Sequence, residues 1–208
     1  IYNIPQYVEP EMGREGWRTK LGIDPSSVVI IMVANYYPEK DFETLLLSFS
    51  KLRENSATNN INLILVGSAP GVSSLKMETK ALAFDNHLSG SVQFLENVDD
   101  IYGLYQAADI GVLSTLSEGF SGSVLEYMHC GLPIVATRIP PNIEALPEAS
   151  HKFLFEPKNV EECTSALAKL ISNPSLRNSI GKVNVVSAKS RFTFKQLKQN
   201  YQELLRQV

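Results

Sequence analysis

The chain alternates short apolar runs with amphipathic segments along most of its length. Val28–Val33 and Asn62–Val66 are continuous apolar runs, which are typical of strands buried on both faces of a parallel sheet. Between them, Phe42–Glu54 repeats apolar residues at helical spacing, and Asp41 stands where an N-cap residue is expected. The pattern therefore predicts a β-α-β unit in this part of the chain.

The same alternation continues toward the C-terminal end of the chain. Further strands are predicted at Ser91–Leu95, Ile110–Leu113, Pro133–Ala136 and Lys152–Phe155. Further helices are predicted at Val72–Ala83, Ile101–Ala107, Val124–Cys130, Asn142–Leu146, Val160–Ile171, Ser175–Lys189 and Thr193–Leu205. This order predicts an α/β fold with a doubly wound, mostly parallel, Rossmann-like sheet, in which ligands bind at the carboxyl ends of the strands.

Composition narrows the classes of partner that the chain can have. Its 208 residues suit one large domain or two small ones, and acidic and basic residues are interspersed around a net charge of −3, so we expect no nucleic-acid partner. The longest apolar stretch, Val28–Ala34, is far shorter than the roughly 20 residues of a membrane span, so we expect no transmembrane segment. Cys130 and Cys163 are expected to be reduced thiols, and the three scattered histidines predict no metal site.

The most informative segment is Ser117–Glu126, because it holds two carboxylates, Glu118 and Glu126, eight positions apart. It follows the predicted strand Ile110–Leu113 and leads into the predicted helix Val124–Cys130. A strand, a glycine-containing turn and a helix start direct backbone N–H groups toward an anion. The carboxylates cannot bind that anion, but they can accept hydrogen bonds from hydroxyls. A nucleotide sugar, with phosphates and many hydroxyls, fits both features.

A longer run that starts at Glu118 carries a family resemblance. It reads Glu-Gly-Phe-Ser-Gly-Ser-Val-Leu-Glu-Tyr-Met-His-Cys-Gly-Leu-Pro-Ile-Val-Ala and resembles the donor-site signature of retaining GT-B glycosyltransferases of family 4. Further matches lie at Pro38–Lys40, Val66–Pro70 and Asp99–Asp109. The resemblance covers nearly the whole chain, but the chain corresponds to only about half of such an enzyme. It implies a single nucleotide-sugar-binding domain over residues 1–208, the C-terminal half of a GT-B fold.

The resemblance also implies roles for particular residues. Glu118 and Lys40 would be the catalytic pair, with Glu118 facing the donor sugar and Lys40 stabilising the diphosphate as it leaves. Glu126 would accept hydrogen bonds from the ribose hydroxyls, and the segment Phe94–Val98 would contact the nucleobase edge through its backbone. Further substrate-binding positions are Gly119, Phe120, Ser121, Asn35, Gly67, Phe94 and Val98.

Ordinary structural roles compete with these assignments. Ser123 and Glu126 also have the spacing of a capping box, in which the two side chains bond backbone N–H groups at a helix start. Glu118 and Lys40 also suit solvated loop positions. Phe120 suits an anchor of its turn, and Phe94 and Val98 suit core packing.

Asn35 is the clearest departure from the family pattern. The family usually has an arginine five positions before the lysine that Lys40 matches, and Asn35 occupies that position here. Asparagine can donate to a phosphate but adds no charge, and a charge-assisted hydrogen bond is roughly twice as strong as a neutral one. Arg138, or a residue of another domain, is the alternative source of that charge.

The ends of the chain carry expectations of their own. Residues 1–20 are expected to be a remnant of an interdomain linker, and residues 172–208 are expected to form helices that pack toward a missing N-terminal acceptor domain. The full-length protein would then be a retaining glycosyltransferase that transfers a hexosyl unit from a nucleotide diphosphate sugar to a saccharide or lipid-linked acceptor, without a cofactor or a metal. The fragment alone would be inactive.

Two other functions stay open at this point. One is a non-catalytic nucleotide-binding or interaction domain of GT-B type, and the other is another GT-B activity such as a nucleotide-sugar 2-epimerase. The expected location is cytoplasmic, and attachment to the inner face of the membrane through the missing domain stays open.

Overall fold

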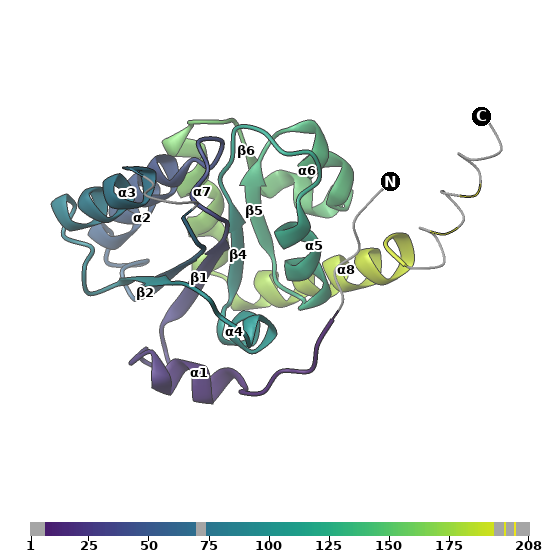
Figure 1. Cartoon of the computed structure of the whole chain (residues 1–208), viewed down its shortest axis with the longest axis horizontal. Coiled ribbons are helices and arrows are strands. Elements are labelled where there is room, and N and C mark those ends of the chain that lie inside the picture. The colour runs from purple at the N-terminus through teal and green to yellow at the C-terminus, as the bar shows by residue number, and fades with distance from the viewer. Residues whose placement is uncertain (1–6, 70–73, 194–197, 199–201, 203–208) are drawn as a thin grey trace.

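A parallel sheet of six strands forms the centre of the computed structural model, which describes residues 7–69, 74–193, 198 and 202 (Figure 1). The strand order is β3-β2-β1-β4-β5-β6, and every neighbouring pair is parallel. This arrangement confirms the predicted doubly wound, Rossmann-like class. The strands are β1 (Val28–Val33), β2 (Ile61–Val66), β3 (Val92–Leu95), β4 (Ile110–Leu113), β5 (Ile134–Thr137) and β6 (Leu154–Phe155).

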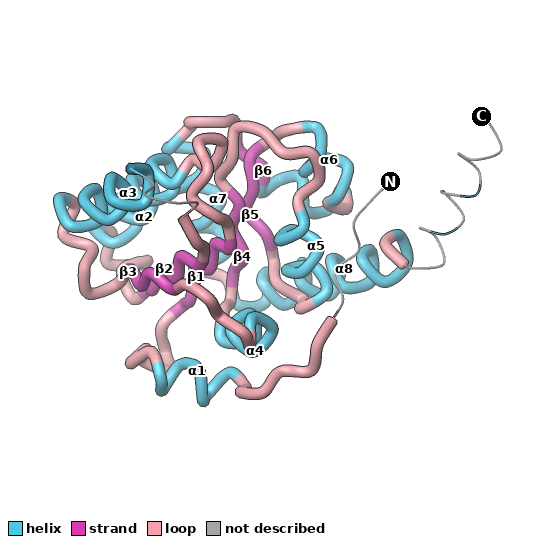
Figure 2. Tube along the Cα trace, viewed as in Figure 1, coloured by secondary structure: helices cyan, strands magenta, loops and turns pink. Residues whose placement is uncertain are grey.

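Helices cover both faces of the sheet (Figure 2). Parallel crossovers are almost always right-handed, so the reversal of strand order at β4 puts the helices before and after it on opposite faces. α2 packs against α3 and α7, and α5 packs against β4. The helices are α1 (Arg14–Lys20), α2 (Phe42–Glu54), α3 (Ser74–Asp85), α4 (Ile101–Ala107), α5 (Gly122–His129), α6 (Pro140–Ala145), α7 (Val160–Ile171) and α8 (Pro174–Arg191). A 3-10 helix, η1 (Glu148–Phe153), precedes β6.

The central strands are apolar throughout because helices cover both of their faces. Ile30, Ile31 and Met32 of β1 are fully buried, and every residue of β4 and β5 is buried as well. A strand with helices on both faces has no solvent-facing side, so apolar residues follow one another without alternation. The continuous apolar runs of the sequence are therefore the inner strands of the sheet.

Most predicted elements occupy their expected ranges, but the strand expected at Lys152–Phe155 is shorter than predicted. Lys152 and Phe153 belong to η1, because the Ser150 N–H donates to the Pro147 carbonyl at 2.8 Å and its hydroxyl donates to the buried Asn184 at 2.7 Å. These bonds keep the backbone coiled until Leu154. The helix predicted at Thr193–Leu205 and the start of the one predicted at Val72 fall mainly outside the described residues.

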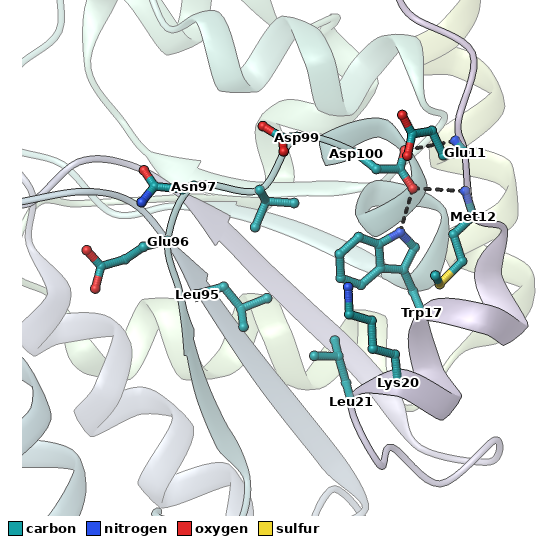
Figure 3. A pocket seen from close by; sticks show the side chains of 11 residues that line it. Glu11, Met12, Trp17, Lys20, Leu21, Leu95, Glu96, Asn97, Asp99 and Asp100 are labelled. Carbon is teal, nitrogen blue, oxygen red and sulfur yellow. Dashed lines mark hydrogen bonds between the residues drawn. The ribbon is translucent and has the colours of Figure 1, made fainter.

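Helix α1 lies in the segment that was expected to be a linker remnant, and the sequence pattern did not predict it. Trp17 is 6% exposed, and α1 packs against α4. The carboxylate of Asp100, at the N-cap of α4, accepts the Trp17 indole N–H at 2.8 Å and the backbone N–H groups of Glu11 and Met12 at 3.1 and 2.9 Å (Figure 3). It also accepts the Gly103 N–H at 3.1 Å, so one carboxylate joins two helix starts.

A second carboxylate ties α1 to the sheet. Asp109, just before β4, accepts Arg18 and Arg14, each at 2.7 Å, and the backbone N–H of Val29 at 2.8 Å. Arg18 is only 4% exposed, and its remaining donors reach backbone carbonyls, including that of Ala107 at 3.0 Å. A buried guanidinium is tolerated here because each of its three nitrogens donates to an acceptor.

We expect Asp100→Ala to loosen α1, because four N–H donors would lose one shared acceptor. Burial opposes ionisation of Asp100, but the hydrogen bonds outweigh it and hold the pKa below its usual value. The loss should be about 3 kcal/mol of unfolding free energy. Trp17 is the single tryptophan, so urea unfolding followed by fluorescence reports the loss directly. The exposed neighbour Asp99 supplies the control, Asp99→Ala; equal stability of both variants would contradict this role of Asp100.

Candidate active site

The winding of the sheet reverses between β1 and β4. From β1 the chain proceeds outward through β2 to β3, and then returns to β4 and proceeds to β5 and β6 on the other side. β1 and β4 are nevertheless direct neighbours, with Ile30 opposite Ile110 and Ile31 opposite Gly111. In open α/β sheets, the loops leaving two such strands diverge and leave a crevice at their carboxyl ends. The β1–α2 and β4–α5 loops carry the predicted site residues.

These two loops are clasped together by their backbones. Lys40 and Thr115 form an isolated antiparallel bridge, and the Leu116 N–H donates to the Glu39 carbonyl at 2.7 Å. The Thr115 hydroxyl donates to the same Glu39 carbonyl at 3.0 Å. The positions of the side chains on either loop are therefore fixed relative to those on the other.

Lys40 and Glu118 meet across this clasp. The Lys40 ammonium forms an ion pair with Glu118 Oε1, and the two side chains are only 15% and 13% exposed. This partial burial excludes the reading in which both residues are ordinary solvated loop positions. The structure thus brings together the two residues predicted to be catalytic, with one positive and one negative charge at the switch point of the sheet.

Two helices begin beside this ion pair. Asp41 is the N-cap of α2, as predicted, and accepts the Thr44 N–H at 3.1 Å. α5 begins at Gly122 after Ser121, whose hydroxyl does not cap the helix but donates to Asn142 Oδ1 at 2.7 Å. The first N–H groups of each helix carry partial positive charge, and this favours an anion nearby.

Glu126 does not take part in a capping box. Because α5 begins at Gly122, Ser123 is the second helical residue instead of the N-cap, and Glu126 is the fifth, two positions past the N3 position that a capping box requires. Its carboxylate instead accepts the Tyr105 hydroxyl at 2.5 Å. Burial raises the pKa of Glu126 above its ordinary value, and the bond from Tyr105 opposes that rise.

The turn between the two carboxylates contains one exposed residue and two anchored ones. Gly119 is exposed, and a Cβ there would meet no atom within 4 Å. Phe120 is partly buried, with its ring 5.9 Å from that of Phe192, and Ser121 is fully buried. Phe120 therefore anchors the turn. The contact of the backbone N–H groups of Gly119, Phe120 and Ser121 with substrate stays a prediction.

Gly67 and Asn35 hold the loops after β1 and β2 together. A Cβ on Gly67 would lie 2.0 Å from the Ala34 carbonyl oxygen, so glycine is needed for the approach of two backbones, and its predicted contact with substrate stays a prediction. Asn35 is exposed, and its carboxamide oxygen accepts the Ser68 N–H at 2.9 Å. This bond leaves the amide nitrogen of Asn35 as the group that can donate to a phosphate.

Arg138 makes its contacts at the β6 edge of the sheet. Its Nε lies 3.1 Å from Glu156, and its Nη2 donates to the Leu154 carbonyl at 3.1 Å. Both partners belong to the β6 region at the edge of the sheet, away from the β1–β4 crevice. The alternative that Arg138 supplies the charge is therefore not supported by its contacts.

Phe94 and Val98 lie at the opposite edge of the sheet. Phe94, in β3, packs on the core, and the Lys80 ammonium is 5.5 Å from its ring centroid. Val98 packs on the core too, and it lines a cavity of about 460 Å³ with Trp17 and Lys20 of α1 (Figure 3). Core packing is confirmed for both residues, and their predicted contact with a nucleobase stays untested.

Two buried polar residues that the sequence pattern did not identify support the site, Tyr105 and Asn142. Tyr105 bonds Glu126, and Asn142 accepts from Ser121 while its amide donates to the Thr137 carbonyl at 2.9 Å. Tyrosine in an apolar helical stretch is itself a signal, since a buried hydroxyl needs a partner. That signal does not say which partner it is.

The structure also bears on the predicted state of the cysteines, on metal binding and on membrane spans. Cys130 and Cys163 are free thiols, as predicted, and burial raises the pKa of each to about 12. Among the described residues, no group of three or more His, Cys, Asp or Glu side chains is placed to hold a metal ion. None of the described helices is long and apolar enough to cross a membrane.

Residues 13–184 match the family model described as glycosyl transferases group 1. The chain belongs to this family. A Campylobacter jejuni relative, an N,N′-diacetylbacillosaminyl-diphospho-undecaprenol α-1,3-N-acetylgalactosaminyltransferase, is 31% identical over 182 residues. The match covers 86% of the chain and 44% of that relative, so this group 1 glycosyltransferase chain spans less than half the relative's length.

Solved structures share the fold of this group 1 domain. HepE of Anabaena, in complex with UDP and glucose, aligns with a TM-score of 0.83 at 23% identity over 92% of the chain and 51% of HepE. The C-terminal domain of a group 1 family protein from Francisella tularensis aligns with a TM-score of 0.75 at 20% identity, over 89% of the chain and 95% of that domain. The fold is thus that of the C-terminal half of a GT-B glycosyltransferase.

The Gly67→Ala substitution tests whether the close backbone contact at Gly67 contributes to the stability of this group 1 domain. We expect Gly67→Ala to destabilise the chain by about 2 kcal/mol, because backbone atoms must shift to admit the new methyl group. Gly119→Ala is the matched control, since its methyl would enter open space. Thermal unfolding of both variants gives the comparison. A Gly67→Ala chain as stable as Gly119→Ala would show that the loops can separate without loss.

Proposed function

We propose that this chain is the donor-binding half of a retaining glycosyltransferase that transfers a hexosyl unit from a nucleotide diphosphate sugar to a saccharide or lipid-linked acceptor. The observation that carries the proposal is the Lys40–Glu118 pair at the switch point between β1 and β4. Membership in the group 1 family supports sugar transfer, and the resemblance of the Glu118–Ala136 run to family 4 supports the retaining mechanism.

The geometry suggests where each part of the donor would lie. The diphosphate would bind between Lys40 and the N-terminus of α5, where one full charge and the helix dipole both favour an anion. The sugar would lie against Glu118, and the ribose against Glu126. Cations and helix ends would thus stabilise the leaving diphosphate, and the proposal includes no metal ion and no cofactor.

The ion pair itself implies an exchange of partners on binding. Without donor, Glu118 neutralises Lys40. A diphosphate carries more negative charge than one carboxylate and would compete for the ammonium, which leaves Glu118 free to accept hydrogen bonds from sugar hydroxyls. The retaining step would then follow at the front face of the sugar, with the leaving phosphate accepting the proton of the acceptor hydroxyl.

A non-catalytic nucleotide-binding domain is the second candidate, because Asn35 provides no positive charge where the family usually has arginine. It predicts nucleotide binding without sugar transfer in any longer form of the protein. For the catalytic form we propose a cytoplasmic setting, with the acceptor bound by another domain of the same protein.

Two variants test the exchange of partners. Lys40→Ala should weaken binding of UDP by about tenfold, as expected when a hydrogen bond to a charged group is lost. Glu118→Gln should leave UDP binding as tight as in the parent or tighter, because Lys40 loses its competing partner. It should also abolish any gain in affinity that UDP-glucose has over UDP. Calorimetry on the 208-residue chain measures both ligands.

The matched control breaks an ion pair far from the crevice. Lys51 and Glu161 pair on the surface, so Glu161→Gln removes the same charge without touching the site. It should change neither affinity. If Lys40→Ala binds UDP as the parent does, Lys40 is not a diphosphate ligand. If UDP, UDP-glucose, GDP-sugars and ADP-sugars all fail to bind the parent, the proposal itself fails.

The chain alone should bind a donor without transferring its sugar. Holding an acceptor hydroxyl against the anomeric carbon can lower a barrier by roughly 7–11 kcal/mol, and we propose that another domain supplies this positioning. Release of nucleoside diphosphate, measured with and without a saccharide acceptor, tests the point. Acceptor-dependent turnover at a rate typical of enzymes, about 1 per second or more, would show that this half is sufficient.

A further inference from the structure

Four tyrosines form a row that leads from the surface to the centre of the sheet. Tyr7 is 48% exposed and meets Tyr102 edge to face at 4.9 Å between ring centroids. Tyr102 meets Tyr105 at 5.8 Å, and Tyr105 meets Tyr127 at 5.3 Å, both nearly perpendicular. The last two rings are fully buried, so Tyr105 is held by aromatic edges on both sides.

The inner end of this row is fixed to the two central strands. Tyr127 accepts the backbone N–H of Val33, the last residue of β1, at 2.7 Å, and lies 3.4 Å from the Val112 carbonyl of β4. Its ring fills the space beside Gly111, where a Cβ would lie 2.6 Å from the ring. Tyr105 therefore packs against Tyr127, which is itself fixed to the carboxyl ends of β1 and β4.

Tyr105 directs its hydroxyl at one oxygen of Glu126. The bond to Oε2 is 2.5 Å long and joins α4 to α5. Among the described residues, none donates a hydrogen bond to the other oxygen, Oε1. A carboxylate with one oxygen held by the protein and the other available is oriented for a ligand hydroxyl. The bond also makes the carboxylate of Glu126 rotate less freely about its last torsion.

We infer that Tyr105 is a positioning residue of the donor site, which orients Glu126 so that Oε1 accepts from the ribose hydroxyls of a nucleoside diphosphate. This inference rests on the proposed ribose contact of Glu126. Tyr105 itself lies behind the carboxylate and acts through it.

The ionisation of Glu126 depends on the balance of two opposing effects. Burial raises its pKa, and the Tyr105 hydroxyl lowers it. The other titratable groups that interact with its charge are Tyr102 of α4, Tyr127 of α5 and Cys130 at the end of α5. Burial raises the pKa of all three, to about 12 for Tyr102 and Cys130, so none of them titrates between pH 6 and 8.5.

A double-mutant cycle tests the inference with UDP as the probe. Tyr105→Phe keeps the ring and removes only the hydroxyl, so the fold should persist. It should weaken UDP binding by about tenfold at pH 7, but by less than twofold when Glu126→Gln is already present. With 2′,3′-dideoxyuridine diphosphate, which lacks the ribose hydroxyls, Tyr105→Phe should have no effect.

The pH profile separates positioning from a structural defect. Without the hydroxyl, the pKa of Glu126 should rise further, so the part of the lost UDP affinity that comes from protonation of Glu126 should shrink as the pH is raised. Carboxyl-carbon NMR of glutamate-labelled chain measures that pKa without any ligand, and the Glu126→Gln spectrum identifies the signal. Tyr102→Phe removes a hydroxyl from the same row and should change neither the pKa nor the affinity by a comparable amount.

The outcomes distinguish the two proposals. An unchanged pKa of Glu126 in Tyr105→Phe overturns the positioning role, whatever the chain binds. A parent chain that binds UDP, combined with equal losses from Tyr105→Phe in both backgrounds, overturns only the role of Tyr105. A parent that binds none of the nucleoside diphosphates overturns the proposed function and this inference together.

Discussion

β1 and β4 lie side by side in the sheet, although β2, β3 and three helices separate them in sequence. This pairing is the constraint on which the other functional features depend. It reverses the direction of winding, separates the helices onto two faces and lets the loops after both strands meet at one edge. The clasp between those loops, the Lys40–Glu118 ion pair and the starts of α2 and α5 all follow from it. A lysine and a carboxylate 78 residues apart could not otherwise share one crevice.

Local patterns in the sequence were sufficient to predict the fold, because parallel strands with both faces covered leave continuous apolar runs that are hard to mistake. α2, α4 and α7 fall in their predicted ranges for the related reason that each has a clear apolar stripe and an Asp or Asn cap. α1 was missed because it is short and its stability comes from outside: Asp100 and Asp109, both far away in sequence, accept its donors. Long-range hydrogen bonds of this kind leave no periodic signal.

In the candidate site, too, the sequence predicted features that depend on local spacing and missed those that depend on long-range contacts. The spacing of Glu118 and Glu126 and their family resemblance identified the residues, but not their partners. Ser123 has the spacing of a capping box with Glu126, and only the actual start of α5 at Gly122 excludes it. Gly67 was identified as a position of close approach, yet the neighbour it admits is the Ala34 backbone. Which two groups come together depends on strand order, and strand order cannot be obtained from spacing.

The attachment of α1 has a mechanical consequence. Asp100 and Asp109 fix residues 11–18 to the starts of α4 and β4, so this stretch must rotate with the sheet as one rigid body. Any rotation of this domain relative to a preceding one would therefore be taken up by backbone φ and ψ torsions before Glu11, because peptide bonds stay planar.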